Sequence, residues 1–373
     1  MKLCFLANAD SIHSYRWIKY FAGDDNYQVH WISLTPNIFS EVKNLKFHPL
    51  KDYRSKLLNI FFNLGKFKKL IEEIKPDLLN VHYAGVNGAL GLMSGFHPLA
   101  LTAWGSDILV TPKKNLFAKL LIRYILKRSD LITCDAKHME EAMVKVGADP
   151  PKIKIINFGI DTKFFSPGKK DEGLEREFGA TGYGIVISLR MLEPIYDIET
   201  FIKAASIVLK EIPDAKFIIG GSGSEEDYLK KLSKSLGISK NIRFVGWISQ
   251  DDLPRYLRTS DIYVSTSLSD AGISSSTAEA MACGLPVIIT DFGDNKEWVK
   301  DEENGLLVPP KNPEILAKKI IYLIKNKELG IKMGKKSRRM IEGRNNYYKE
   351  MEKMGQLYFL LQEKPPRKSL IKK

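Results

Sequence analysis

The chain has 373 residues, of which 44% are hydrophobic and 27% charged, so it can form full cores in two ordinary domains and is not a disordered chain. Its formal net charge of +13 favours anionic partners such as nucleotides or an acidic membrane surface, although a lysine-rich solvated surface explains the charge equally well. No apolar run reaches the roughly 18 residues of a membrane span, and the start MKLCFLANAD lacks the features of a signal peptide. Three widely spaced cysteines in apolar runs indicate no disulfide framework and favour a reduced, cytoplasmic compartment.

Short strand-like runs alternate with amphipathic helical segments along the chain. In the first half the expected strands are 2–8, 29–34, 77–85, 99–105, 131–136 and 153–159. In the second half they are 184–190, 216–223, 242–247, 261–267, 285–291 and 305–310. This alternation predicts an α/β fold of two doubly wound, Rossmann-like domains with parallel sheets, facing each other across a cleft.

A Pro-Gly pair and a charge run mark a seam at 161–173. We therefore expect an N-terminal domain at 1–165, a C-terminal domain at 166–345, and a final helix with a basic tail at 346–373. Ligands of open parallel sheets bind at the carboxyl ends of the strands, so the polar residues directly after each strand are the candidates for function.

The segment STSLSDAGISSSTAEAMACG, residues 265–284, joins an expected strand to an expected helix. Gly272 permits a tight turn, and a helix beginning near Ser275 would offer free N–H groups to a diphosphate. Ser276 and Glu279 also have the spacing of a capping box, so an ordinary helix start is the alternative that the local pattern favours.

Two other features of the second half also fit either a phosphate-binding role or an ordinary structural role. Arg190 follows a strand, where its guanidinium could clamp a phosphate, but such an arginine is more often a surface ion-pair residue. Gly221 and Gly223 form a G-x-G pattern, but Glu226 stands at the third glycine position and would repel a pyrophosphate. A dinucleotide-dependent oxidoreductase is therefore disfavoured.

Polar residues also gather after the strands of the first half. Asp10 and Ser11 begin an expected helix that continues through His13, His82 ends a strand, and Asp107 follows AWGS. N-capping and a structural histidine are the alternatives for individual members, but their common sheet edge favours a functional role for the group.

Segments 53–71 and 119–129 are apolar and aromatic at helical spacing, with interleaved Lys and Arg. They predict either sheet-packing helices with basic outer faces or helices that lie on an anionic membrane. The sequence contains no D-x-D motif, no His/Cys cluster with ligand spacing and no nucleic-acid module, so we expect no metal and no nucleic-acid partner.

The run SSTAEAMACGLPVIITD, followed by EWVKDEENGLLVPP, resembles the retaining GT-B glycosyltransferases of the glycogen-synthase-like group 1 family. The segments MKLCFLANADSIHSYRWIKYFA, TAWGSDIL, IINFGIDTKFFSP and FVGWISQDDLPRYLRTSDIYVSTS agree with that family in order and spacing, so the resemblance covers nearly the whole chain. It implies a nucleoside-diphosphate sugar bound by the second domain, and a glycan, lipid-linked saccharide or small acceptor bound by the first. It also implies hexosyl transfer with retained configuration, without a metal or other cofactor, and a last helix, 346–362, that crosses back to the first domain.

The resemblance also assigns residues. The expected catalytic residues are Arg190, Asp270 and Glu279. The donor is expected to contact Arg190, Tyr196, Gly246, Trp247, Ile248, Gly272, Ile273, Ser274, Ser275, Ser276 and Glu279. The helix start and Arg190 would neutralise the departing diphosphate, Glu279 would bind the ribose, and the loop around Trp247 would bind the base. The acceptor side is assigned to Asp10, Ser11, His13, His82 and Asp107.

Two positions depart from the family pattern. The first Glu of its E-x7-E motif falls on Ala271, with Asp270 as the neighbouring substitute, and a lysine of its diphosphate site falls on Tyr196, which carries no charge. These departures keep open a non-catalytic relative that binds nucleotide sugars or glycans, and a same-fold nucleotide-sugar epimerase is a further alternative. The expected location is cytoplasmic, with peripheral association at the inner membrane face as an open extension.

Overall fold

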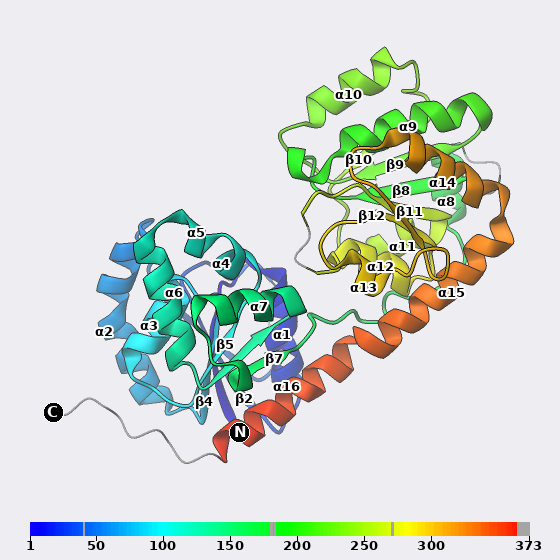
Figure 1. The fold of residues 1–373 in the computed structure, drawn as a ribbon. Coiled ribbons are helices and arrows are strands. Elements are labelled where there is room, and N and C mark those ends of the chain that lie inside the picture. The colour runs from blue at the N-terminus through cyan, green and yellow to red at the C-terminus, as the bar shows by residue number, and fades with distance from the viewer. Residues whose placement is uncertain (40–41, 180–181, 183, 270–271, 364–373) are drawn as a thin grey trace. The chain divides into compact units, whose positions relative to one another are not determined.

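The computed structural model describes residues 1–39, 42–179, 182, 184–269 and 272–363, and the chain divides into two compact units (Figure 1). The first unit comprises Met1–Phe158 and Tyr348–Lys373, and the second comprises Gly159–Tyr347. The first division therefore precedes the seam expected at 161–173, and the last helix belongs to the first unit.

Two arginines explain where the Pro-Gly segment lies. Arg258 donates to the carbonyl oxygens of Ser166 at 2.7 Å and Phe164 at 3.1 Å, and Arg338 donates to that of Phe165 at 3.2 Å. The segment is thus fastened to the second unit as a bound loop. Its composition indicated a loop but could not indicate the body on which that loop packs.

The first unit is built on a seven-stranded parallel sheet with the strand order β3-β2-β1-β4-β5-β6-β7. Its strands are β1 Lys2–Leu6, β2 Gln28–Ser33, β3 Leu45–Pro49, β4 Leu78–His82, β5 Leu99–Thr102, β6 Leu131–Cys134 and β7 Ile153–Ile155. Strand β3 was not predicted, because its sequence LKFHP is mostly exposed or half-buried and ends in proline, as suits a strand at a sheet edge.

Helices cover both faces of this sheet. They are α1 Ile12–Ala22, α2 Lys56–Ile74, α3 Val86–Ser94, α4 Ser106–Leu109, α5 Thr111–Lys114, α6 Leu116–Arg128, α7 Lys137–Val146 and α16 Tyr347–Gln362. Helices α2, α3 and α6 lie side by side on one face (Figure 1). Helix α16 packs with α1, where the rings of Phe21 and Tyr358 lie 5.1 Å apart.

The second unit has a six-stranded parallel sheet with the order β10-β9-β8-β11-β12-β13. Its strands are β8 Ile185–Leu189, β9 Lys216–Gly220, β10 Ile242–Gly246, β11 Ile262–Ser265, β12 Val287–Thr290 and β13 Leu306–Val308. Its helices are α8 Glu172–Phe178, α9 Ile198–Glu211, α10 Glu226–Ser235, α11 Leu253–Thr259, α12 Ser275–Ala282, α13 Asn295–Trp298, α14 Pro313–Lys325 and α15 Lys327–Arg344. The two parallel sheets with flanking helices confirm the predicted fold class.

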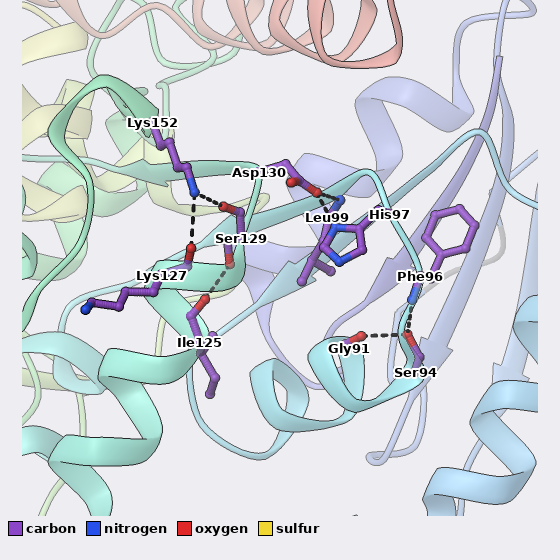
Figure 2. Close-up of polar contacts among 10 residues, drawn as sticks. All are labelled: Gly91, Ser94, Phe96, His97, Leu99, Ile125, Lys127, Ser129, Asp130 and Lys152. Carbon is purple, nitrogen blue, oxygen red and sulfur yellow. Dashed lines mark hydrogen bonds and ion pairs between the residues drawn. The ribbon is translucent and has the colours of Figure 1, made fainter. Parts of the chain in front are cut away.

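At the amino edge of the first sheet, side chains form hydrogen bonds that hold the strand starts in place (Figure 2). Asp130 accepts hydrogen bonds from the backbone N–H of Leu99 at 2.8 Å and from His97 Nδ1 at 2.6 Å. Lys152 donates to the carbonyl oxygens of Lys127 and Ser129, where its charge also complements the C-terminal end of α6. These contacts fix the starts of β5 and β6, so this edge has a structural role.

A buried hydrogen-bond chain links α16 to the centre of the first sheet. Trp17 donates to Tyr358 Oη at 3.3 Å, and Tyr358 donates to Asn80 Oδ1 at 2.9 Å. The two ring nitrogens of His82 lie 3.1 Å from Asn80 Oδ1 and 3.1 Å from Ser14 Oγ. His82 is fully buried, so the expectation that it contacts an acceptor at the sheet edge is wrong. Its ring is part of the hydrogen-bonded core of the first unit instead.

The buried imidazole of His82 should make stability depend on pH. Burial lowers its pKa from 6.5 to about 3, with a smaller contribution from His13, so the unfolded chain binds the proton more readily than the fold. The stability contributed by the neutral ring is complete above pH 6.5 and declines as the pH falls. We expect the free energy of unfolding to lose about 1.4 kcal/mol per pH unit from this group between about pH 6 and 4.

Urea unfolding of the full chain as a function of pH tests this expectation. His82→Gln should remove this part of the slope. Tyr358→Phe interrupts the same hydrogen-bond chain but keeps the imidazole, so it should lower stability at every pH while retaining the slope. Equal slopes for the original chain and His82→Gln would contradict the assignment.

Candidate active site

Helix α12 follows β11 at the carboxyl edge of the second sheet. Its N-cap is Ser274, whose Oγ accepts a hydrogen bond from the backbone N–H of Thr277. Ser276 lies inside the first turn, with its Oγ 2.8 Å from Tyr263 Oη. The capping box expected from Ser276 and Glu279 is therefore wrong, because an earlier serine caps the helix and Tyr263 engages the Ser276 hydroxyl.

The other expected donor residues of this segment lie around the start of α12, and their contact with a donor stays a prediction. Gly272 and Ile273 are buried directly before the cap, and Ser275 begins the helix, whose N-terminus provides backbone N–H groups and a positive dipole end. Glu279 is buried one turn further along the same helix. Asp270 and Ala271 lie outside the described residues, so the sugar-binding carboxylate expected at Asp270 stays a prediction.

Arg190 lies on the same edge, directly after β8. Its guanidinium stacks over the ring of Tyr196 at 4.4 Å, and its Nη2 donates to Ser267 Oγ at 3.3 Å. The backbone of the Tyr196 turn is itself fixed, because its carbonyl oxygen accepts a hydrogen bond from Thr266 Oγ1 at 3.0 Å. Tyr196 thus acts as a platform that orients Arg190, and its expected contact with the donor stays a prediction.

The glycine-rich turn after β9 has a structural explanation. A β-carbon on Gly221 would lie 2.1 Å from the carbonyl oxygen of Arg190, and one on Gly223 would lie 2.3 Å from that of Leu192. Gly221 also has a φ of +133°, which side chains other than glycine rarely adopt. Glu193 secures the turn by accepting hydrogen bonds from the N–H and Oγ of Ser224. The G-x-G pattern thus allows two loops to meet at the carboxyl edge, which removes the main argument for a dinucleotide site.

The expected base-binding loop follows β10. Gly246 ends that strand with a φ of +67°, and its carbonyl oxygen accepts a hydrogen bond from the N–H of Gly221 at 2.8 Å. Trp247 comes next and is 80% exposed, whereas the side chain of Ile248 lies against Gly220. An exposed indole beside the glycine-rich turn offers a flat surface on which a nucleobase can stack.

In the first unit, the carboxyl edge carries an aromatic pair that the sequence only partly indicated. The ring of His13 stacks on Trp104, with centroids 5.2 Å apart, and burial lowers the pKa of His13 to about 4. The histidine is therefore neutral at pH 7 and forms a half-buried aromatic surface with Trp104.

The other two expected acceptor residues of this edge, Asp10 and Ser11, make contacts within the unit. Asp10 accepts a hydrogen bond from Thr35 Oγ1, and Ser11 caps α1 by accepting from the N–H of Ser14.

Asp107 is a positioning residue and not an exposed acceptor contact. Its buried carboxylate accepts hydrogen bonds from the backbone N–H groups of Ala84 at 2.9 Å, Trp104 at 3.2 Å and Gly105 at 3.0 Å. Burial raises its pKa, against the opposing effect of these hydrogen bonds. The carboxylate joins the loops after β4 and β5 and thereby fixes Trp104. The sequence indicated Asp107 as a polar residue after a strand, but it did not indicate that Asp107 holds Trp104 in place.

Two negative findings concern only the described residues. None of their helices is both long and apolar enough to cross a bilayer. Among the same residues, no three His, Cys, Asp or Glu side chains form a group suited to a metal ion.

Two parallel sheets with helices on both faces, each with polar residues at its carboxyl edge, are the architecture of GT-B glycosyltransferases. The solved structure of the Anabaena protein HepE in complex with UDP has a TM-score of 0.80 at 17% identity and covers 97% of this chain and 100% of its own. A glycosyltransferase from Rickettsia africae has a TM-score of 0.84 at 16% identity, covering 98% and 99%. These likenesses show the fold.

Sequence comparison then shows the family. Residues 171–340 match the model of "Glycosyl transferases group 1", and residues 2–136 match the model of "Glycosyl transferase 4-like" proteins. Together the two models span most of the chain, which is a glycosyltransferase whose second unit contains the group 1 domain. An Escherichia coli relative, the UDP-Gal:alpha-D-GlcNAc-diphosphoundecaprenol alpha-1,3-galactosyltransferase, is 26% identical over 83% of this chain and 86% of its own. A Methanocaldococcus jannaschii relative described only as an uncharacterized glycosyltransferase is 38% identical over 50% of this chain and 48% of its own.

The stacking of Arg190 on Tyr196 gives a test of the donor site. Arg190→Ala should weaken binding of whichever nucleoside diphosphate (UDP, GDP or ADP) the chain prefers by about tenfold to a hundredfold, because a charged hydrogen bond is worth about 1.5–3 kcal/mol. Tyr196→Ala should weaken it by about threefold to tenfold through loss of the platform, whereas Tyr196→Phe keeps the ring and should bind normally. Isothermal titration calorimetry measures each affinity.

The double variant Arg190→Ala with Tyr196→Ala supplies the control. If Tyr196 acts through Arg190, the double variant should bind no worse than Arg190→Ala alone. A loss of affinity in Tyr196→Phe as large as in Tyr196→Ala would instead show that the hydroxyl contacts the ligand.

Proposed function

We propose that the chain transfers a sugar from a nucleoside-diphosphate sugar to a glycan or lipid-linked saccharide, with retained anomeric configuration and without a metal ion. The observation that carries this proposal is the presence of Arg190 and the start of α12 at the carboxyl edge of one sheet, where Ser267 and Tyr196 orient the guanidinium. A departing diphosphate gains negative charge, which a fixed guanidinium and a helix N-terminus are suited to stabilise.

The proposed reaction has one bond exchange at the anomeric carbon. The bond from that carbon to the diphosphate oxygen breaks, and an acceptor hydroxyl oxygen bonds to the same face of the sugar. The acceptor proton passes to the departing phosphate oxygen, so the products are a glycoside and a nucleoside diphosphate. Arg190 and the N–H groups of α12 hold the diphosphate, Glu279 holds the ribose and Trp247 stacks on the base.

Named relatives support a particular donor and acceptor class. HepE has been solved with UDP and with UDP-glucose, and the name of the Escherichia coli relative describes transfer from UDP-Gal to a diphosphoundecaprenol-linked sugar. We extend the proposal accordingly to a uridine-diphosphate sugar and a lipid-linked saccharide. The His13–Trp104 surface is the proposed acceptor contact, and such an acceptor would draw the enzyme to the inner membrane face.

A glycosyltransferase relative that binds its donor but has lost the transfer activity is the second candidate. It is favoured by Tyr196 and Ala271, which stand where the family has a charged lysine and a sugar-binding glutamate. It predicts that nucleotide sugars bind but are not consumed with any acceptor. Turnover of the donor separates the two candidates directly.

A screen of UDP, GDP and ADP sugars tests the proposal. The preferred nucleotide should raise the melting temperature, and its sugar should be consumed in the presence of polyprenyl-diphosphate saccharides in buffer containing EDTA. NMR of the product should show the anomeric configuration of the donor.

Glu279→Gln and Arg190→Ala should each lower turnover by at least about tenfold, whereas Glu226→Gln on α10 should not. An inverted product, or activity abolished by EDTA and restored by a divalent cation, would contradict the mechanism. Donor consumption without an acceptor would favour an epimerase or a hydrolase.

A further inference from the structure

The first unit exposes large apolar side chains at the starts of two helices, α2 and α6, that flank α3 on one face of the sheet. They occupy the first two turns of α2 and of α6, and the most exposed are Leu57 at 66%, Phe61 at 77%, Leu116 at 71% and Phe117 at 67%. An open apolar groove of about 540 Å³ continues this surface, lined by Leu57, Ile60, Phe61, Leu64, Gly65, Lys68 and Met93. Clusters of large exposed apolar side chains on a folded domain mark an interaction surface.

The topology places both apolar starts toward the same edge of the sheet. Helix α2 follows β3 and helix α6 follows β5 by way of α4 and α5, and all strands of this sheet are parallel. Each crossover helix therefore begins on the side of the carboxyl edge and runs back toward the amino edge. Helices α2, α3 and α6 also lie side by side (Figure 1). The apolar side chains thus lie toward the edge that carries His13 and Trp104.

Positive charge surrounds these apolar turns. Residues 53–71 and 108–129 contain no Asp or Glu, but they contain Arg54, Lys56, Lys66, Lys68, Lys69, Lys113, Lys114, Lys119, Arg123, Lys127 and Arg128. Most of these basic side chains are exposed, and Lys68 lines the apolar groove. Lysine and arginine can keep their charged ends at the headgroup level while their stems cover apolar surface. The charge therefore complements an anionic bilayer.

We propose that the exposed faces of α2, α5 and α6 form a lipid-docking surface that seats the first unit on an anionic membrane. Phe61 and Leu57 of α2, with Leu116 and Phe117 of α6, enter the interface between headgroups and acyl chains, and the surrounding lysines contact lipid phosphates. The groove along α2 accommodates part of an acyl chain. This docking faces the acceptor edge toward the bilayer, and it does not depend on the proposed reaction, since it needs no donor.

Vesicle sedimentation without nucleotide tests the surface. The full chain should bind vesicles of phosphatidylcholine with 30% phosphatidylglycerol and bind pure phosphatidylcholine far more weakly. The double variant Phe61→Ser with Phe117→Ser should lower binding by at least about tenfold. Lys114→Gln with Lys119→Gln should lower it by roughly fivefold per charge and reduce its salt dependence. The matched control, Tyr322→Ser with Ile331→Ser, removes two exposed apolar side chains from the second unit and should bind normally.

Site-specific labelling shows which turns meet the lipid. The three native cysteines are buried, so one cysteine in place of Phe61, Phe117 or Tyr322 can carry an environment-sensitive dye. Anionic vesicles should shift the emission at positions 61 and 117 to the blue and leave position 322 unchanged. Circular dichroism melting confirms that each variant is folded.

Three results would overturn the proposal. The first is equal or negligible binding to both vesicle types, and the second is an unchanged spectrum at position 61 or 117. The third is self-association that Phe61→Ser with Phe117→Ser abolishes while vesicle binding is unaffected, which would make the surface a contact between two copies. A chain that binds the vesicles but transfers no sugar would leave the docking surface standing and refute only the proposed function.

Discussion

The donor side of the second unit depends on a close approach between two backbone segments. The carbonyl oxygens of Arg190 and Leu192 lie against Gly221 and Gly223 at distances that no β-carbon tolerates. This contact fixes the path of the chain after β8, and hence the point from which the Arg190 side chain leaves the sheet. Tyr196 and Ser267 then determine its direction. In the proposed reaction, the glycines therefore act on the diphosphate only indirectly, by positioning an arginine.

In the first unit a carboxylate, that of Asp107, holds a neighbouring side chain in place. Asp107 gathers three backbone N–H groups from the loops after β4 and β5, and so holds Trp104 over the core and beside His13. In both units a residue that resembles a ligand contact in the sequence serves to hold a neighbouring side chain in place. The residue held in this way is an arginine in one unit and a tryptophan in the other, and we propose that each contacts a substrate.

The sequence was sufficient for the fold, because strands buried on both faces give continuous apolar runs with polar ends, and every expected run contains a strand. The sequence was not sufficient to predict the role of a polar residue where that role depends on its tertiary contacts. His82 and Asp107 follow the pattern of polar residues at strand ends, but Ser14 and the N–H of Ala84, both distant in sequence, help to hold them inside the unit. Ser276 fits a capping box by spacing, but Tyr263 on the preceding strand engages its hydroxyl and Ser274 takes the cap. Spacing along the chain specifies local geometry and contains no information on such partners.

Helix α16 has a consequence for how the protein is made. The first unit takes its last core residues, including Tyr358, from the far end of the chain, after all of Gly159–Tyr347. A ribosome therefore releases every residue of the second unit before the first unit is complete. Until then Trp17 and Asn80 lack the tyrosine that joins them. A nascent first unit therefore lacks part of its core during synthesis of the second, and a shortened product without α16 would contain a complete second unit and an unfinished first unit.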